Sequence, residues 1–186
     1  MQVNNRDRLH LLTERITSLH RASLRKTAAA NELKLAQLEA LVYLSVANRY
    51  SNTPAALVEY LGVTKGTISQ TLKALERHGL IEKRTDADDG RVQRCHVTKN
   101  GMKVVKQAYP ADHYANLDTR TIDALTTSTE THLRALQRAN EFRTFGQCGT
   151  CQLFQARGNA GTCGLTGEKL STKDSLKICR EHEQAV

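Results

Sequence analysis

The stretch TPAALVEYLGVTKGTISQTLKALERHG, residues 53–79, decides the fold of this 186-residue chain. Thr53 followed by Pro54 is typical of a helix N-cap with proline at the first helical position, and Gly62 suits a helix end in the left-handed conformation. Thr64 can cap a second helix, whose apolar residues recur at helical spacing. Two helices joined by so short a turn predict a helix-turn-helix.

The second helix of this pair has a polar and basic outer face, because its apolar residues Ile68, Leu72 and Leu75 all fall on the opposite side. In a helix-turn-helix the second helix lies in the major groove of DNA. We therefore expect its outer face to contact DNA. The residues concerned are Lys65, Thr67, Ser69, Gln70 and Lys73.

Residues 80–98 predict a β-hairpin, the wing. The runs 80–84 and 92–97 are short and alternating enough to be strands, and a charged turn separates them. Cys95 falls on the face that points inward, so we expect a small buried hydrophobic residue rather than a redox-switch thiol. Arg94 falls on the other face, where we expect it to lie open and to reach phosphate.

With this hairpin the chain resembles the MarR family of bacterial transcription regulators. The resemblance rests on the helix pair, on residues 79–84, on Asp89-Gly90-Arg91, and on Val97-Thr98 with Gly101 beyond. It covers roughly residues 5–145 and implies a mainly α fold with a small β-wing, a winged helix-turn-helix. In that family the wing arginine enters the minor groove and the aspartate two residues before it orients the wing. Those roles carry over to Arg91 and Asp89.

Two long helices are expected to flank the winged helix. Residues 4–30 have one apolar stripe, and a second long helix is expected from residue 118 or 121 to about 145, with a kink or weak point at its polar, β-branched run 126–131. The resemblance implies that these helices pair across the two-fold axis of a homodimer. The stripes comprise Leu9, Leu12, Ile16, Leu19 and Leu24, and Ile122, Leu125, Leu133 and Leu136.

Composition agrees with a nucleic-acid partner. The formal net charge is +8 and the pI about 9.4, which is the electrostatic pattern expected of a DNA-binding domain. The sequence has no apolar run of membrane-spanning length and no signal-peptide core, so we expect a cytoplasmic protein with no membrane partner. No Ser/His/Asp arrangement and no phosphate-binding loop is recognisable, so an enzyme is not predicted.

The composition changes at Gly146. Residues 1–145 predict the winged-helix and dimerisation domain. Residues 146–186 predict a small cysteine-rich module that has too few core residues to fold without a bound metal or a cross-link. Four of the five cysteines lie in this module. In a cytosolic protein such thiols are more readily metal ligands than structural disulfides. The predicted ligands are Cys148, Cys151, Cys163 and Cys179.

Four thiolates suit either an iron–sulfur cluster or Zn²⁺. Only Cys148 and Cys151 are closely spaced, whereas zinc ribbons commonly have two such pairs, so a cluster is favoured and zinc is the alternative. Thiols acting without metal are a third interpretation, and His182 could replace one ligand. The site could sense redox or metal state, or it could be a staple only.

The sequence therefore predicts a sequence-specific regulator, a repressor of MarR type, which binds double-stranded DNA at a palindromic operator as a homodimer and is gated by its cysteine module. One alternative is a metal-handling or redox carrier that uses the helical body only for dimerisation. Another is a repressor that responds to a small apolar or phenolic effector and has a purely structural zinc site.

Overall fold

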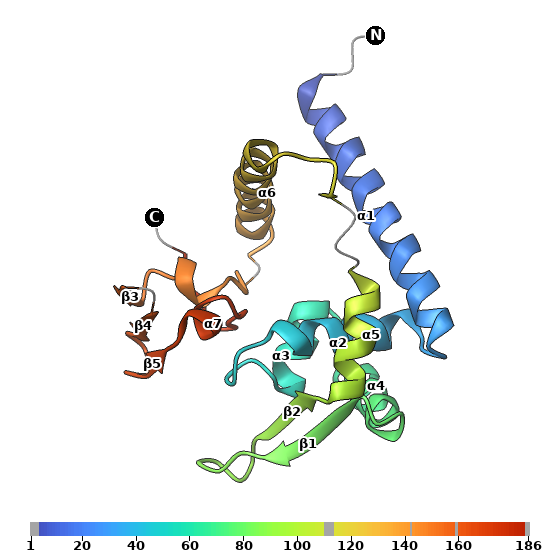
Figure 1. Cartoon of the computed structure of the whole chain (residues 1–186), viewed down its shortest axis with the longest axis vertical. Coiled ribbons are helices and arrows are strands. Elements are labelled where there is room, and N and C mark those ends of the chain that lie inside the picture. Colours follow the sequence, from blue (N-terminus) through green and yellow to red (C-terminus); the bar gives the residue numbers. More distant parts are fainter. Residues whose placement is uncertain (1–3, 110–113, 142, 159, 185–186) are drawn as a thin grey trace.

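The computed structural model describes residues 4–109, 114–141, 143–158 and 160–184 and has the predicted mainly α architecture (Figure 1). A winged helix occupies the middle of the chain, two long helices flank it, and a small module with strands follows. The helices are α1 (Asn5–Ala30), α2 (Leu35–Val46), α3 (Pro54–Leu61), α4 (Lys65–Arg77), α5 (Lys99–Ala108), α6 (Thr119–Ala139) and α7 (Thr172–Ser175). The strands are β1 (Ile81–Thr85), β2 (Gln93–Val97), β3 (Phe154–Arg157), β4 (Ala160–Cys163) and β5 (Lys169–Leu170), and η2 (Cys148–Thr150) is a 3₁₀ turn.

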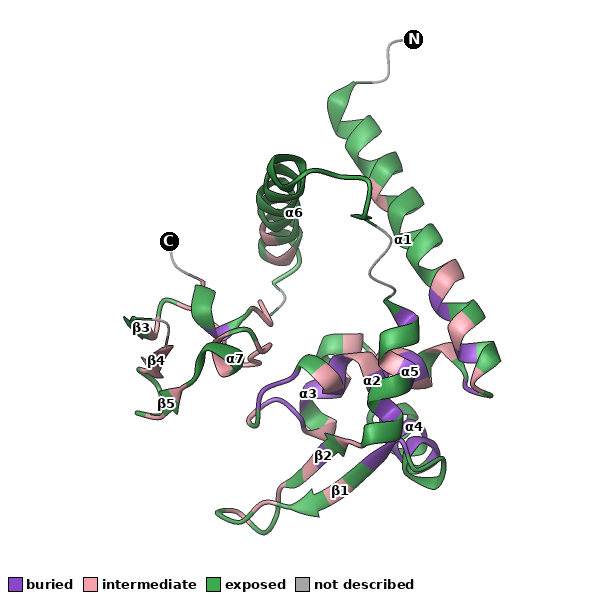
Figure 2. Ribbon diagram, viewed as in Figure 1, coloured by how far each residue is buried: buried purple, intermediate pink, exposed green. Residues whose placement is uncertain are grey.

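The hydrophobic core lies within the winged helix, around α2. Leu38 and Leu41 of α2 are fully buried and pack with residues from α3, α4, β1, β2, α5 and the C-terminal end of α1. Figure 2 shows buried residues gathered on these elements, whereas most of α1 and all of α6 are exposed or partly exposed. The core thus fixes α4 and the wing relative to each other.

The helix-turn-helix forms through the local signals that its sequence carries. The Thr53 hydroxyl accepts a hydrogen bond from the Ala56 N–H, and Gly62 ends α3 with a φ of 63°. Thr64 caps α4 in the same way through the Thr67 N–H. Further along, a Cβ at Gly101 would lie 2.2 Å from the Leu80 carbonyl oxygen, so only glycine lets α5 approach the start of the wing.

The wing is a two-stranded antiparallel hairpin in which Ile81 pairs with Val97 and Thr85 with Gln93. Cys95 is 1% exposed, and burial raises the pKa of its thiol to about 11. It is therefore a small buried residue with an inert thiol, as the strand pattern predicted.

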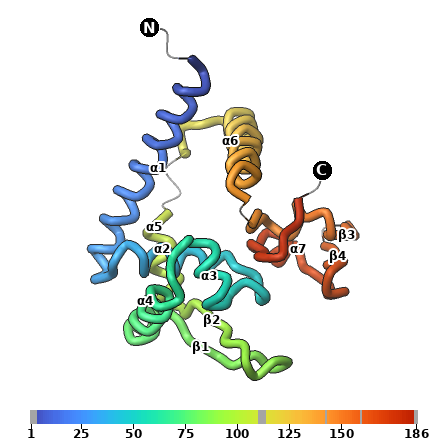
Figure 3. Tube along the Cα trace, turned by 180° about the vertical axis from the view of Figure 1, so that it is seen from behind, coloured from blue at the N-terminus to red at the C-terminus, as the bar shows by residue number. Residues whose placement is uncertain are grey.

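The two long helices differ in part from expectation. α1 agrees with the predicted residues 4–30, and α6 runs without interruption through residues 126–131, where the Thr127 and Thr131 hydroxyls donate to carbonyls four residues earlier within the helix. The polar, β-branched run therefore does not interrupt the helix. α6 also ends at Ala139 rather than near residue 145, since Glu141 takes the left-handed conformation with a φ of 54°. From opposite sides, Figures 1 and 3 show α1 projecting away from the winged helix.

The module after residue 146 has more regular structure than its sequence suggested. β3, β4 and β5 form an antiparallel sheet in that order, with η2 before it and α7 after it. Among its described residues, 146–158 and 160–184, only Cys148 and Gly161 are buried. No helix in the part of the chain that the structure describes is long and apolar enough to cross a membrane.

Candidate DNA-binding surface and cysteine site

The outer face of α4 is open to solvent along its length. All five residues predicted to contact DNA are exposed, while Ile68, Leu72 and Leu75 on the opposite side are buried. The amphipathic pattern of the helix produces this arrangement, because its apolar stripe is fixed by the core. The exposed set is Lys65, Thr67, Ser69, Gln70 and Lys73.

Asp89 holds Arg91 at the tip of the wing. The Arg91 Nε donates to Asp89 Oδ1 at 2.9 Å, its terminal nitrogen donates to Oδ2 at 3.0 Å, and its backbone N–H donates to Oδ1 at 3.0 Å. These hydrogen bonds lower the pKa of Asp89 and raise that of Arg91. The Arg91 side chain nevertheless remains 91% exposed, so it is oriented but free to meet a partner.

Arg94 does not lie open as the strand pattern predicted. Its side chain is only 17% exposed, and its Nε donates to Asp86 Oδ2 at 2.6 Å. Asp86 also accepts the backbone N–H groups of Asp88 and Asp89, so it ties Arg94 to the turn of the wing. Together these bonds lower the pKa of Asp86, the Arg94 bond most of all. Arg94 is thus a brace of the wing in this structure.

All four cysteines of the module line one small pocket of about 30 Å³. Cys148 and Cys151 come from η2 and the residue after it, Cys163 ends β4, and Cys179 follows α7. The remaining wall is mostly apolar, from Leu153, Phe154, Leu165 and Leu170, with Glu181 at one side. Within the described ranges, no three His, Cys, Asp or Glu side chains are arranged so that they could hold a metal ion.

Hydrogen-bond donors reach two of these sulfur atoms. The Asn48 Nδ2 donates to Cys148 Sγ at 3.4 Å, and the Glu183 backbone N–H donates to Cys151 Sγ at 3.4 Å. Cys148 and Cys179 also hydrogen-bond to each other. That bond lowers the pKa of Cys179 and raises the pKa of Cys148. Of the two, Cys179 is therefore the more readily deprotonated to the thiolate, the form in which cysteine binds metals.

His182 is not available to replace a cysteine. Its Nδ1 lies 2.7 Å from the Thr144 hydroxyl and its Nε2 lies 3.1 Å from the Thr150 hydroxyl, so both ring nitrogens have partners. Burial lowers the pKa of the imidazole. A Cβ at Gly146 would lie 2.6 Å from the ring, which explains glycine at the start of the module. His182 is a structural residue here, unlike the ligand that its position after Cys179 suggested.

The module is docked on the winged helix, which no sequence pattern indicated. Phe145 contacts the rings of Tyr43 and Tyr60, with ring centroids 6.2 and 5.3 Å away. The Arg180 guanidinium binds the Glu59 carboxylate of α3 through two hydrogen bonds, with its Nε 2.8 Å from Oε2. The Tyr50 hydroxyl donates to the carboxylate of Glu168 in the module at 2.8 Å.

The polar loop between α2 and α3, residues 47–52, receives most of the backbone contacts of the module. Asn48, Ser51 and Asn52 are buried although they are polar. In the sequence, residues 48–52 indicate only a polar loop after an apolar helix, which alone does not identify a docking site.

The sequence of residues 32–92 matches the model of the MarR family. That segment includes α2, the helix-turn-helix and the first part of the wing. The matched segment is similar to that family, and the fold described above is a winged helix-turn-helix. The match ends well before the cysteine module.

Solved structures agree with this assignment of the fold. A point mutant of MepR from a multidrug-resistant Staphylococcus aureus clinical isolate superposes with a TM-score of 0.60 at 21% identity, over 74% of this chain and 100% of that one. A MarR-family regulator from Silicibacter pomeroyi gives 0.57 at 23% identity, over 72% and 94%. CouR from Rhodococcus jostii RHA1, solved with p-coumaroyl-CoA, gives 0.54 at 14%, over 70% and 94%. No curated protein matches the chain.

Proposed function

We propose that this chain is a sequence-specific DNA-binding transcription regulator of the MarR type. One observation carries the proposal: one domain presents an open polar and basic helix face beside a wing whose exposed Arg91 is held by Asp89. The α4 face enters the major groove, and Arg91 enters the minor groove. A net charge of +8 supplies the general attraction to phosphate.

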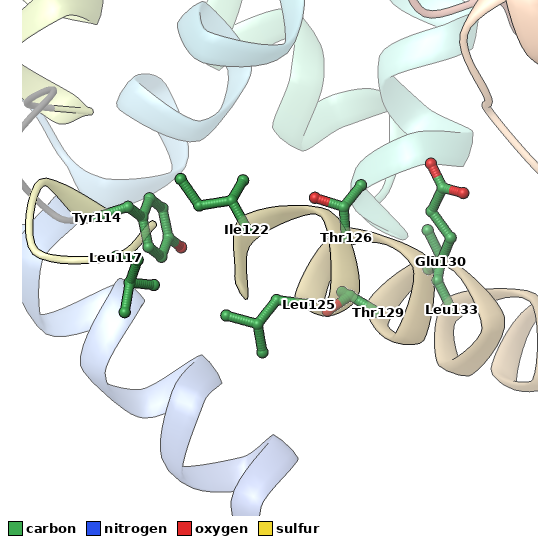
Figure 4. A pocket seen from close by; sticks show the side chains of 8 residues that line it. All are labelled: Tyr114, Leu117, Ile122, Leu125, Thr126, Thr129, Glu130 and Leu133. Carbon is green, nitrogen blue, oxygen red and sulfur yellow. The ribbon is translucent and has the colours of Figure 1, made fainter. Parts of the chain in front are cut away.

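The regulator acts as a homodimer. Large apolar side chains on α1 and α6 remain about half exposed, including Leu12, Ile16, Leu125 and Leu133. Tyr114, Leu117 and side chains of α6, drawn in Figure 4, line a groove of about 340 Å³, and a neighbouring groove adds Ile16 and Leu19 of α1. An apolar surface of this extent on helices outside the core favours a second copy of the chain as its occupant.

A two-fold dimer of winged helices fits a palindromic operator with half-sites roughly one helical turn apart, about 10 bp from centre to centre. Repression follows if the operator overlaps a promoter, because the bound dimer then blocks it. The cytoplasm is the compartment in which such a protein meets DNA.

The DNA-binding proposal is tested by a gel shift on an operator selected from random duplexes at physiological salt. Arg91→Ala should weaken binding by about 1–3 kcal/mol, with a steep salt dependence throughout. Arg157→Ala, on exposed β3 of the module, removes the same charge and should change affinity little. Equal affinity of Arg91→Ala and wild type would show that the wing does not read DNA. A chain that selects no duplex would favour a metal-handling or redox carrier instead.

Sedimentation tests the dimer. Replacing Leu12 and Leu136 by glutamate should give a monomer, because charges then face the apolar stripes of the partner. Glutamate at Leu165 and Leu176, exposed leucines of the module, is the matched control and should leave the dimer intact. A Leu12/Leu136 variant that sediments as wild type would exclude this interface.

The cysteine module, in this proposal, holds a metal centre that changes operator affinity. The donor set supports it: four sulfur atoms from three separate segments line one pocket with largely apolar walls, and amide donors reach two of the sulfurs. An iron–sulfur cluster is favoured over zinc, because cluster cysteines are commonly drawn from separate loops. Cys148, Cys151, Cys163 and Cys179 would hold it once their side chains moved closer together, because no three of them are placed to hold a metal ion in the arrangement described above. When bound, a cluster supplies reversible one-electron chemistry, which hydrogen bonds to sulfur tune.

Metal analysis and absorption of protein purified without oxygen test the centre. A cluster gives brown protein with iron and sulfide, whereas zinc gives colourless protein with one zinc per chain. Cys163→Ser should reduce the content of either. Protein that carries no metal and four free thiols would rule the centre out and leave the DNA-binding proposal standing.

A small-molecule effector is a second candidate, favoured by the groove beside Tyr114 (Figure 4). In a dimer, part of that groove could remain open to an apolar or phenolic ligand. Phenolic acids that lower operator affinity without altering metal content would support this role, together with a zinc centre that only stabilises the module.

A further inference from the structure

The segment that contains Cys179 is hydrogen-bonded to the winged helix on both sides of the cysteine. The Ile178 N–H donates to the Val46 carbonyl at 2.8 Å, and the Ile178 carbonyl accepts the Asn48 N–H at 2.9 Å. The Arg180 N–H donates to Ser51 Oγ at 2.7 Å. One cysteine of the pocket is therefore fixed to the residues that join α2 to α3.

Cys148 makes a second connection to the same place. Asn48 is 8% exposed, and its side-chain amide donates to the sulfur of Cys148. The Cys148 N–H donates in turn to the Lys177 carbonyl at 3.1 Å, just before the Ile178 segment. Two cysteines on opposite ends of the module thus converge on residues 47–52, which we call the coupling loop.

The coupling loop leads directly to the wing and to the first helix of the helix-turn-helix. The Asn52 carbonyl accepts the N–H of Cys95 in β2 at 2.8 Å, and the next residue, Thr53, caps α3. A displacement of the loop would therefore move the wing strand and the first helix of the helix-turn-helix together. Within the described residues, the buried side-chain oxygen of Asn52 has no hydrogen-bond partner. A buried acceptor without a hydrogen bond destabilises the fold. A second arrangement of the loop that gave this oxygen a donor would remove that destabilisation.

We propose that the coupling loop transmits the state of the cysteine centre to the DNA-reading surface, with Asn48 and Ser51 as positioning residues. The inference rests on the proposed centre and regulator, and it adds the physical route between them. Ligation would fix Cys148 and Cys179, and through their contacts with residues 47–52 it would fix the loop. Loss of the centre frees both cysteines, so the loop, α3 and β2 shift to a state with a different operator affinity.

The first test compares operator affinity of metal-loaded and metal-depleted protein. Ser51→Ala with Glu59→Gln loosens Arg180 from the winged helix without touching a cysteine. Wild type should show a difference of about tenfold or more between the two states, and the double variant a difference under about threefold at equal metal content. Ser18→Ala on α1 with Glu32→Gln makes the same chemical changes away from the module and should keep the wild-type ratio. If the double variant also keeps the wild-type ratio of operator affinities between metal-loaded and metal-depleted protein, the coupling loop does not transmit the state of the centre.

A second test does not depend on DNA or on any variant. Amide hydrogen exchange on wild-type protein should show that metal removal speeds exchange at Asn48, Ile178 and Cys95 by about tenfold or more. Buried amides of α2, such as that of Leu41, are the internal reference and should not change. Unchanged exchange at Asn48 and Cys95 in a protein that demonstrably lost its centre would refute the coupling, whether or not the chain binds an operator.

Discussion

The winged helix and the cysteine module are held together by different kinds of interaction. The winged helix buries a continuous set of aliphatic side chains around Leu38 and Leu41. The module buries only Cys148 and Gly161 among its described residues and relies on short strands, caps and its contacts with the winged helix. The winged helix therefore carries its own stability, whereas the module depends on its contacts with the winged helix and, in the function proposed above, on a metal centre.

This difference determines how each region should respond to damage. A core distributes its stabilisation over many contacts, so one truncation leaves a cavity and a weakened but folded domain. A module organised around one centre loses its principal support when one ligand is removed, because metal binding supplies its folding free energy. Substitutions matched between the two regions separate these behaviours.

The largest effect is expected from serine substitutions of cysteine. Cys151→Ser should abolish metal binding and make residues 146–186 sensitive to protease, because a serine hydroxyl is a poor ligand for a soft metal. Limited proteolysis with mass spectrometry measures this. Cys95→Ser makes the same change in the winged helix, where it should retain the metal and lower the free energy of unfolding by about 1–3 kcal/mol. Identical proteolysis patterns for the two variants would contradict the idea that the module, unlike the winged helix, depends on a metal centre for its stability.

An intermediate effect is expected from truncating leucine. Leu41→Ala removes a fully buried side chain and should lower the free energy of unfolding of the winged helix by about 2–5 kcal/mol, measured by urea denaturation. Leu165→Ala, in the module, truncates a side chain that is 58% exposed and should change stability by less than about 0.5 kcal/mol. A large loss at Leu165 would mean that the module has an apolar core after all.

The same contrast explains which parts of the molecule were predictable. Helix caps and periodicity are local, so Thr53-Pro54, Gly62 and the apolar stripe of α4 were enough to predict the winged helix. The four cysteines were likewise identifiable by residue type, and the structure brings them to one pocket. The strands of the module were missed, because β3 reads Phe-Gln-Ala-Arg and lacks the β-branched residues typical of strands.

Long-range partners were beyond the reach of sequence patterns. Alternation along β2 assigned a face to Arg94 but did not indicate that Asp86 would occupy that face. The docking contacts join residues about a hundred positions apart, such as Asn48 with Cys148 and Ser51 with Arg180. Neither end of such a pair carries a local signal, so the residues of the coupling loop became candidates only through the structure.

The smallest effect is expected at the contact between the two regions, and it is pH-dependent. The hydrogen bonds from Arg180 lower the pKa of Glu59 below its ordinary value of 4.5. A carboxylate whose pKa is lowered by folding stabilises the docked state fully above that ordinary value, and this contribution is lost as pH falls through the lowered pKa. Because Glu59 is about one-third exposed, the contribution should be only about 0.2–1 kcal/mol.

Docking of the module should therefore loosen as pH drops below about 4.5, before the core of the winged helix unfolds. Amide exchange in residues 178–180, compared with that in α2, measures this loosening. Glu59→Gln should show weaker docking at pH 7 and less change on acidification, since glutamine has no proton to gain. Glu32→Gln, in the turn between α1 and α2, removes the same charge and should retain the wild-type pH profile. A Glu59→Gln profile that matches wild type would place the stability of the interface in Phe145 and its aromatic neighbours instead.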